Sequence, residues 1–246
     1  MKKFVSLFAA VPCAFIFGDG LYCQYNINKG KEKLYGSPDF DKTDSEIMMQ
    51  RQSIVETMQQ LFEMKTIKPH KLKTCFKESI TYEDPYLLCK GRDEVLKCFS
   101  LLPITMESCE TTQFTPQHHR NFIQVVHEHR LDCKSGFQRI HSVSRKGNLI
   151  LELETIDGKV MVKGITDEWN GKAIHGSISD PLVWYHYPSQ VLRRLRTKWL
   201  LFYLPHTDTG HFITDKIVQT FKPVHISERE LAIRNSLSPP TPKHSK

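Results

Sequence analysis

The sequence lacks the short motifs that mark the commonest nucleotide and hydrolase sites. It contains no G-x-x-x-x-G-K-[ST] loop, no G-x-G-x-x-G turn, no H-E-x-x-H pair and no G-x-S-x-G elbow. Each of these motifs places backbone amides, metal ligands or a nucleophile where its chemistry needs them. Their absence removes support for nucleotide-loop, dinucleotide and common hydrolase functions. No tandem repeat is present either, which argues against a solenoid or a propeller.

Cysteine occurs, but not in a metal-binding arrangement. The seven cysteines are scattered, with no C-x-x-C pair and no Cys/His ladder at zinc-finger spacing. His127 and His129 share one face of a predicted strand, yet no third ligand stands at a suitable spacing. We therefore predict no metal and no cofactor. Cys75 and Cys98 adjoin apolar residues and are expected to be buried, as free cysteines usually are.

Long apolar runs are also scarce, and the clearest one, over 4–17, is short. Lys2 and Lys3 precede it in the manner of a secretory signal, although Pro12 interrupts the run and no small-x-small cleavage site follows. The run is shorter than the roughly 20 apolar residues that cross a bilayer. The compartment stays open: a cytoplasmic location is favoured, and targeting to the secretory pathway or an organelle by residues 1–20 is the alternative.

Composition divides the 246 residues into one folded domain and two extensions. We expect an N-terminal extension over 1–43 that ends in a polar linker, a domain over 44–204, and a polar, disordered tail over 205–246. A hydrophobic content of 39% suffices for one core. The formal net charge of +7 only weakly favours an acidic partner, and no strand alternates basic and aromatic residues. Nucleic acid is therefore not an expected partner.

Hydrophobic periodicity predicts helices first and strands afterwards. Thr43 to Glu46 fits a capping box, and apolar residues then recur on one helical face as far as Phe62. A short helix is expected over 66–77, and another after Gly91. Period-two alternation predicts strands at 80–84, 104–114, 121–132, 149–153 and 160–169. This order predicts an α+β fold, in which a curved antiparallel sheet wraps around the N-terminal helices.

Asp84 is the most unusual residue of these strands. It ends the strand that contains Ile80 and Tyr82, on the same face as both, and Pro85 follows it. A carboxylate at the inner end of an apolar strand is costly to bury without a partner or a raised pKa. We therefore expect a cavity here. The alternative is that Asp84 and Pro85 form only an Asx-type turn that closes the strand.

These elements together resemble the NTF2-like superfamily, which includes the SnoaL-like proteins and the ketosteroid isomerases. The resemblance covers 44–199 and is carried by F-x-x-S-I-T-Y-E-D-P, G-R-D-E-V and D-E-W-N-G-K, and it is closest to uncharacterised NTF2-like proteins. It implies a cone of curved sheet and helices whose open end binds an apolar small molecule. Met58, Tyr82 and Trp169 are the expected lining residues, and a homodimer is a further implication.

Carried over residue by residue, the resemblance gives an incomplete catalytic set. Asp84 matches the general-base aspartate of the ketosteroid isomerases, in which oxyanion donors stabilise an enolate. The tyrosine donor of that family falls at Met58, whose thioether donates nothing. Asp167 matches the second donor, a protonated aspartate, if the strand is slipped; Ile165 matches otherwise. Enzymatic activity is left open, with a SnoaL-like isomerase, dehydratase or cyclase as the alternative to a binding protein.

A second unusual stretch, VWYHYPSQVLRRLRTKWLLFYLP, follows Pro181. It predicts an amphipathic helix with an apolar stripe, which includes Leu195, Trp199 and Phe202. The basic residues between them are Arg193, Arg194, Arg196 and Lys198. We expect the apolar face to pack over the cone, as in most soluble domains. Binding to an anionic membrane surface or to another protein is the alternative.

Overall fold

The computed structural model describes residues 21, 24–25, 27–28, 32–40, 44–65, 67–133, 142–174, 177–178 and 183–203. The predicted targeting segment over 1–20 and the predicted tail over 205–246 lie outside these ranges. Within them, no helix combines the length and apolar character needed to cross a bilayer.

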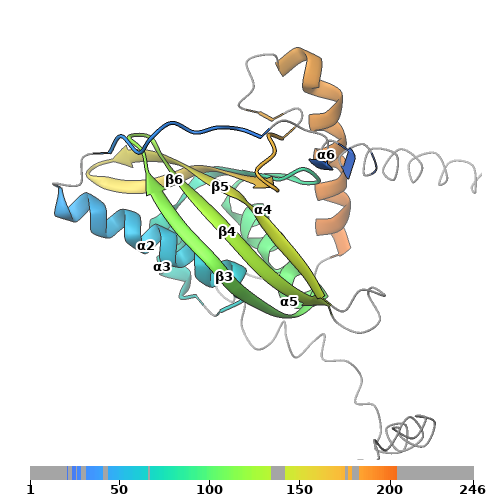
Figure 1. Ribbon diagram of the computed structural model, residues 1–246, viewed down its shortest axis with the longest axis horizontal. Coiled ribbons are helices and arrows are strands. Elements are labelled where there is room, and N and C mark those ends of the chain that lie inside the picture. Colours follow the sequence, from blue (N-terminus) through green and yellow to red (C-terminus); the bar gives the residue numbers. More distant parts are fainter. Residues whose placement is uncertain are drawn as a thin grey trace, which may run out of the picture.

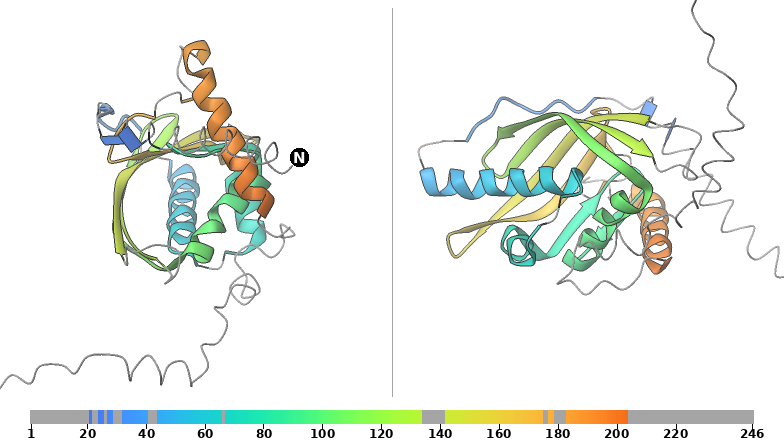
Figure 2. Two further views of the ribbon diagram at one scale, coloured as in Figure 1. Left: turned by 90° about the vertical axis from the view of Figure 1, so that its right-hand side faces the viewer. Right: turned by 90° about the horizontal axis from the view of Figure 1, so that it is seen from below.

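Helices and one six-stranded sheet make up the described structure, in the order that the periodicity predicts. The helices are α2 (Ser45–Phe62), α3 (Pro69–Cys75), α4 (Arg92–Phe99), α5 (Leu101–Thr105) and α6 (Val183–Tyr203). The strands are β1 (Phe76–Glu83), β2 (Leu88–Lys90), β3 (Met106–His118), β4 (Phe122–Cys133), β5 (Ser142–Ile156) and β6 (Lys159–Trp169). The predicted α+β cone is confirmed, because the curved, open sheet wraps around α2 (Figures 1 and 2).

The sheet is mixed, which corrects the prediction of a wholly antiparallel one. Its spatial order is β2-β1-β6-β5-β4-β3. The consecutive strands from β3 to β6 pair antiparallel, since short turns join them. Strand β1 instead runs parallel to β6, with Tyr82 opposite Ile165. A long connection separates these two strands in the sequence, and such a connection permits parallel pairing.

Helix α2 fills the concave side of the sheet with an apolar face. Its cap is Asp44, not Thr43, because Oδ1 of Asp44 accepts hydrogen bonds from the amides of Glu46 and Ile47, each 3.1 Å long. Met58 and Leu61 are fully buried. The helix therefore forms the core with the sheet rather than covering it from outside.

The residues predicted as linker contact the outer face of the sheet. The amide of Lys33 donates to the carbonyl of Gly171 over 3.2 Å, and the ring of Tyr35 lies 5.9 Å from that of Phe122. Further along, Oδ1 of Asp39 accepts a 2.9 Å hydrogen bond from the amide of Arg120. Residues 32–40 thus follow the sheet toward the start of α2 (Figure 1).

Candidate functional site

The concave face of the sheet changes from apolar to polar along each central strand. On β4, for example, Ile123 and Val125 are followed on the same face by His127 and His129, all of them buried. We call the first region, together with the face of α2 that packs on it, the apolar half; it consists of Ile54, Met58, Leu61, Ile80, Ile123, Val125, Leu149, Leu151, Val162 and Ile165. The second region, the polar half, consists of Tyr82, Asp84, His127, His129, Arg145 and Asp167. Sheet register gathers these side chains from β1, β4, β5 and β6, except for Asp84, which directly follows β1.

Asp84 combines the two roles that the sequence left open. One carboxylate oxygen, Oδ1, accepts hydrogen bonds from the amides of Tyr86 (2.7 Å) and Leu87 (2.6 Å), which is an Asx-type turn. The other, Oδ2, accepts a 3.0 Å hydrogen bond from the hydroxyl of Tyr82. Burial raises the pKa of Asp84 above the usual range of an aspartate, and although Arg145 opposes this, Asp167 adds to it. A raised pKa suits a group that exchanges a proton near neutral pH.

Asp167 is fully buried and carries the opposite shift. Its Oδ2 pairs with Arg145 and lies 3.4 Å from the hydroxyl of Tyr82, while its Oδ1 lies 3.4 Å from Nε2 of His127. Burial alone would raise the pKa of Asp167, but Arg145 and His127 outweigh it and lower the pKa to about 2. The carboxylate is thus ionised at neutral pH and has no proton to donate. It accepts hydrogen bonds, whereas the family resemblance implied a protonated donor.

Tyr82 connects the two carboxylates. Burial, together with the charges of Asp84 and Asp167, raises the pKa of Tyr82 well above its ordinary value, so the hydroxyl keeps its proton. That single proton can serve only one carboxylate at a time. Tyr82 therefore acts as a shared donor between one carboxyl group whose pKa is raised and one whose pKa is lowered.

The rings of His127 and His129 pack against the C-terminal end of α2. Phe62 stacks on His127 and His129 at ring distances of 5.6 and 4.8 Å, and Nδ1 of His129 lies 3.1 Å from the hydroxyl of Thr111. Burial, with the neighbouring His127 and Arg145, lowers the pKa of His129 to about 4, so it is neutral near pH 7. Across the described ranges, no group of three or more His, Cys, Asp and Glu residues is arranged to hold a metal ion.

Several buried polar atoms in and beside the polar half have no hydrogen-bond partner in the described part of the chain. They are Nδ1 of His127, Nε2 of His129, Nε of Arg145 and Nε1 of Trp169. Nε2 of His127 and Oδ1 of Asp167 have only each other, at 3.4 Å. Buried polar groups in folded proteins are nearly always hydrogen-bonded, to water where no protein group is available. Water or another polar group inside the cone would satisfy these atoms.

Glycine at position 147 allows β5 to lie close to its neighbours beside the polar half. It pairs with His127 across β4 and β5. A Cβ atom there would lie 2.5 Å from the carbonyl oxygen of Glu168 and 3.1 Å from Nε2 of His127. The strand thus approaches both neighbours more closely than any side chain would allow.

The predicted lining residues fall in different places. Tyr82 belongs to the polar half, and Trp169 lies beside it, because the guanidinium of Arg145 sits 4.1 Å from the Trp169 ring centre. Met58 lies in the apolar half. Arg145 was missed by the sequence analysis, since the strand predicted to start at 149 begins at Ser142. Extending the alternation back from Leu149 would have placed it on the inner face.

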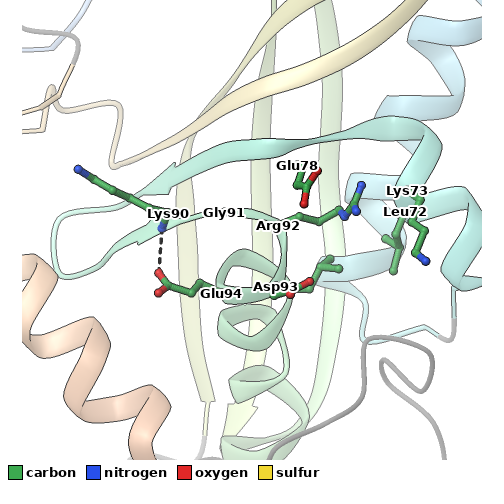
Figure 3. A pocket seen from close by; sticks show the side chains of 9 residues that line it. Leu72, Lys73, Glu78, Lys90, Gly91, Arg92, Asp93 and Glu94 are labelled. Atoms are coloured by element: carbon green, nitrogen blue, oxygen red, sulfur yellow. Dashed lines mark hydrogen bonds between the residues drawn. The ribbon is translucent and has the colours of Figure 1, made fainter.

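Three cavities lie away from the six side chains of the polar half. One, of about 430 Å³, is lined by residues of α3, β1 and the start of α4 (Figure 3). Its side chains carry both charges, and Oε2 of Glu94 accepts a 3.0 Å hydrogen bond from the amide of Lys90. The others, of about 420 and 380 Å³, lie at the β5–β6 turn and under residues 32–33. None of the three is lined by Asp84, Asp167 or Tyr82.

Helix α6 packs in the reverse of the predicted orientation. Leu195, Trp199 and Phe202 are 56%, 53% and 80% exposed, whereas Arg193 is fully buried and Arg196 nearly so. The physical reason is that the arginines find buried acids and backbone carbonyls on the cone, which satisfy their donors. The apolar stripe is therefore not the packing face.

Comparisons with known proteins find likeness at the level of fold alone. No family model matches the chain, and no curated protein matches it. A putative SnoaL-like polyketide cyclase from Jannaschia sp. CCS1 is similar, with a TM-score of 0.43, 8% identity, and coverage of 54% of this chain and 90% of that one. So is a putative scytalone dehydratase from Novosphingobium aromaticivorans, with a TM-score of 0.40, 13% identity, and coverage of 52% and 88%.

A third similar structure is that of a hypothetical protein of ketosteroid-isomerase-like fold from Catenulispora acidiphila, in complex with trimethylamine. Its TM-score is 0.37 at 14% identity, and the match covers 51% of this chain and 88% of that one. The first and third of these proteins are described as SnoaL-like and ketosteroid-isomerase-like, which is the group that the sequence motifs resemble. At such identities no activity, ligand or residue role is transferred to this chain.

Proposed function

We propose that the cone binds a small, largely apolar molecule and holds the polar end of that molecule in the polar half. The observation that carries the proposal is the set of buried polar atoms without a hydrogen-bond partner on His127, His129, Arg145 and Trp169. A ligand group with oxygen or nitrogen atoms would satisfy them.

Aromatic side chains beside these atoms favour an apolar body for the ligand. Phe62 and Phe99 meet edge to face at 5.5 Å, and Tyr82 approaches Phe99 at 5.4 Å. Small-molecule sites typically combine such apolar walls with a few polar groups that fix orientation. The proposed ligand is therefore a compact ring compound with one carbonyl or hydroxyl group.

A SnoaL-like isomerase, dehydratase or cyclase is the competing function. The raised pKa of Asp84 and its contact with Tyr82 favour proton transfer. Against catalysis of the ketosteroid type stand the ionised Asp167 and the thioether of Met58, neither of which can stabilise an oxyanion. Each missing donor is worth about 3 to 4 kcal/mol in the transition state.

The membrane alternative draws little support from the charges of α6. Arg193 pairs with Glu83, and both Arg194 and Lys198 pair with Glu94. Charges already engaged with acidic side chains attract an anionic surface less than free ones do. A ligand inside the cone remains the better-supported function.

The test compares 2-naphthol with naphthalene, which lacks the hydroxyl. Titration followed by NMR should show that 2-naphthol shifts the ring signals of His127 and His129 and binds at least about tenfold more tightly, the worth of one buried hydrogen bond. Arg145→Lys should weaken this preference. Equal binding of the two compounds, or unmoved histidine signals, would reject the polar half as the ligand site.

A turnover assay separates binding from catalysis. A β,γ-unsaturated steroid ketone should be isomerised very slowly or not at all, because neither Met58 nor the ionised Asp167 can donate a hydrogen bond to an oxyanion. Absorbance of the conjugated product measures the rate. Robust turnover that disappears in Asp84→Asn would replace the binding function by the enzymatic one.

A further inference from the structure

Helix α6 holds the main chain of the loop that carries Asp84. We call residues 84–88, between β1 and the first residue of β2, the Asp84 loop. Four neighbouring side chains of α6 each bind a backbone group in it. Arg193 donates to the carbonyl of Asp84 (3.1 Å), Arg196 to that of Tyr86 (2.8 Å) and Arg194 to that of Leu88 (3.1 Å), while Thr197 accepts from the amide of Leu88 (2.9 Å).

A buried ion pair fixes the residue just before this loop. Nη1 of Arg193 lies 3.2 Å from Oε2 of Glu83, and the two side chains are 0% and 1% exposed. Glu83 also accepts hydrogen bonds from the hydroxyl of Ser177 and the amide of Ile178. Burying two charges is costly, so such a pair is weak evidence for stability, but its geometry restricts where Asp84 can lie.

A series of contacting basic and aromatic side chains continues from α6 to the polar half. The guanidinium of Arg196 lies 5.6 Å from the ring centre of Tyr86, and the rings of Tyr86 and Trp169 are 5.1 Å apart. Trp169 in turn carries the guanidinium of Arg145, the partner of Asp167. Cations and aromatic rings attract each other in this arrangement. The helix thus contacts the site through both the backbone and the side chains of the loop.

From these contacts we infer that α6 positions Asp84, and that Arg193 and Thr197 are positioning residues of the candidate site. The helix keeps the Asp84 loop in the conformation in which one carboxylate oxygen caps the turn and the other meets Tyr82. Release of α6 would let water reach the carboxylate. The inference rests on the proposed function only in taking Asp84 as a site residue, and its readouts need no ligand.

The test uses two mild variants of the full chain. Arg193→Lys keeps the positive charge but removes the rigid guanidinium whose Nη1 donates to both Glu83 and Asp84. Thr197→Val is nearly isosteric and removes only the acceptor for the amide of Leu88. The charge near Asp84 is unchanged in both, so a change in its titration reports on its position. Lys198→Gln is the matched control, because Lys198 pairs with Glu94 on α4.

Two measurements decide the outcome: a carbon-13 NMR titration of the Asp84 carboxyl, assigned with Asp84→Asn, and amide exchange at Tyr86 and Leu87. In both variants the pKa of Asp84 should fall toward that of an ordinary aspartate, and the two amides should exchange at least about tenfold faster as the turn loosens. The Lys198→Gln control should match the wild type in both readouts.

A wild-type titration and wild-type exchange in Thr197→Val, with α6 still protected, would overturn the inference. The same holds for Arg193→Lys if it folds; if it does not, Thr197→Val alone decides. Failure of 2-naphthol to bind would remove the proposed function without affecting these readouts. Normal 2-naphthol binding with an unmoved Asp84 would remove the positioning role alone.

Discussion

The apolar and polar halves of the cone share the same curved strands and the same packed helix, α2, yet they serve different purposes. In the apolar half, every inward side chain gains by leaving water. In the polar half, the neighbouring positions hold two carboxylates, two imidazoles, a phenol and a guanidinium, whose burial is costly unless each finds partners. The comparison shows that the fold draws its stability from one half, which lets the other carry groups that stability alone would not select.

The largest effect is expected when a charge enters the apolar half. Met58→Asp should lower the free energy of unfolding by several kcal/mol, on the order of 5, or prevent folding, because nothing nearby can pair with the carboxylate. Urea denaturation measures the loss. Met49→Asp is the control, because the Met49 side chain on the same helix is 67% exposed. This change should alter stability by less than about 0.5 kcal/mol. Wild-type stability of Met58→Asp would contradict the assignment of α2 to the core.

The second-largest loss of stability is expected when a charge is removed from the polar half. Arg145→Met leaves Asp167 buried without its partner, which typically costs about 3 to 5 kcal/mol. In the double variant Arg145→Met with Asp167→Asn, the unpaired charge is gone. Its free energy of unfolding, measured by urea denaturation, should therefore recover much of this loss. If the double variant were as unstable as the sum of both single changes, the two side chains would not act as a pair.

The smallest effect concerns pH. His129 has its pKa lowered to about 4, against an ordinary value near 6.5, so the unfolded chain binds a proton that the folded chain does not. Stability should therefore fall as pH falls from about 6.5 to about 4, with a slope of at most about 1.4 kcal/mol per pH unit. His129→Phe, which keeps an aromatic ring beside Phe62, should remove this contribution.

The difference between the wild type and His129→Phe isolates one histidine. Asp84, with its raised pKa, contributes with the opposite sign: its stabilisation is present at low pH and is lost as pH rises through its folded pKa. Asp167 titrates near 2, below this window. Identical pH profiles of the two proteins between pH 4 and 6.5 would show that His129 does not titrate as the structure indicates.

Local patterns predicted much of the fold and only part of the site. Alternation along β1 identified Tyr82 and Asp84 as inward residues, because a strand shows its faces in its own sequence. Arg145 and its pairing with Asp167 depend on the register between β5 and β6, which one sequence does not display. The parallel pairing of β1 with β6 was missed for the same reason.

The orientation of α6 shows a second limit. Periodicity correctly indicated an apolar stripe, and in most soluble helices that stripe is buried. It could not reveal that Arg193 pairs with Glu83, or that Arg193, Arg194 and Arg196 donate hydrogen bonds to carbonyls of the Asp84 loop. Long-range hydrogen bonds of this kind outweigh a local pattern and leave no local trace.

The residues that meet in and around the polar half lie far apart in the sequence, which bears on when the site can form. Tyr82 and Asp167 stand 85 positions apart in the chain, and Asp84 and Arg193 stand 109 apart. Loops of this length close late, because their entropy must be lost before any contact forms across them. During synthesis β1 leaves the ribosome well before β6, and α6 emerges last. Until then Asp84 is an ordinary hydrated aspartate, so the site exists only once the domain is complete.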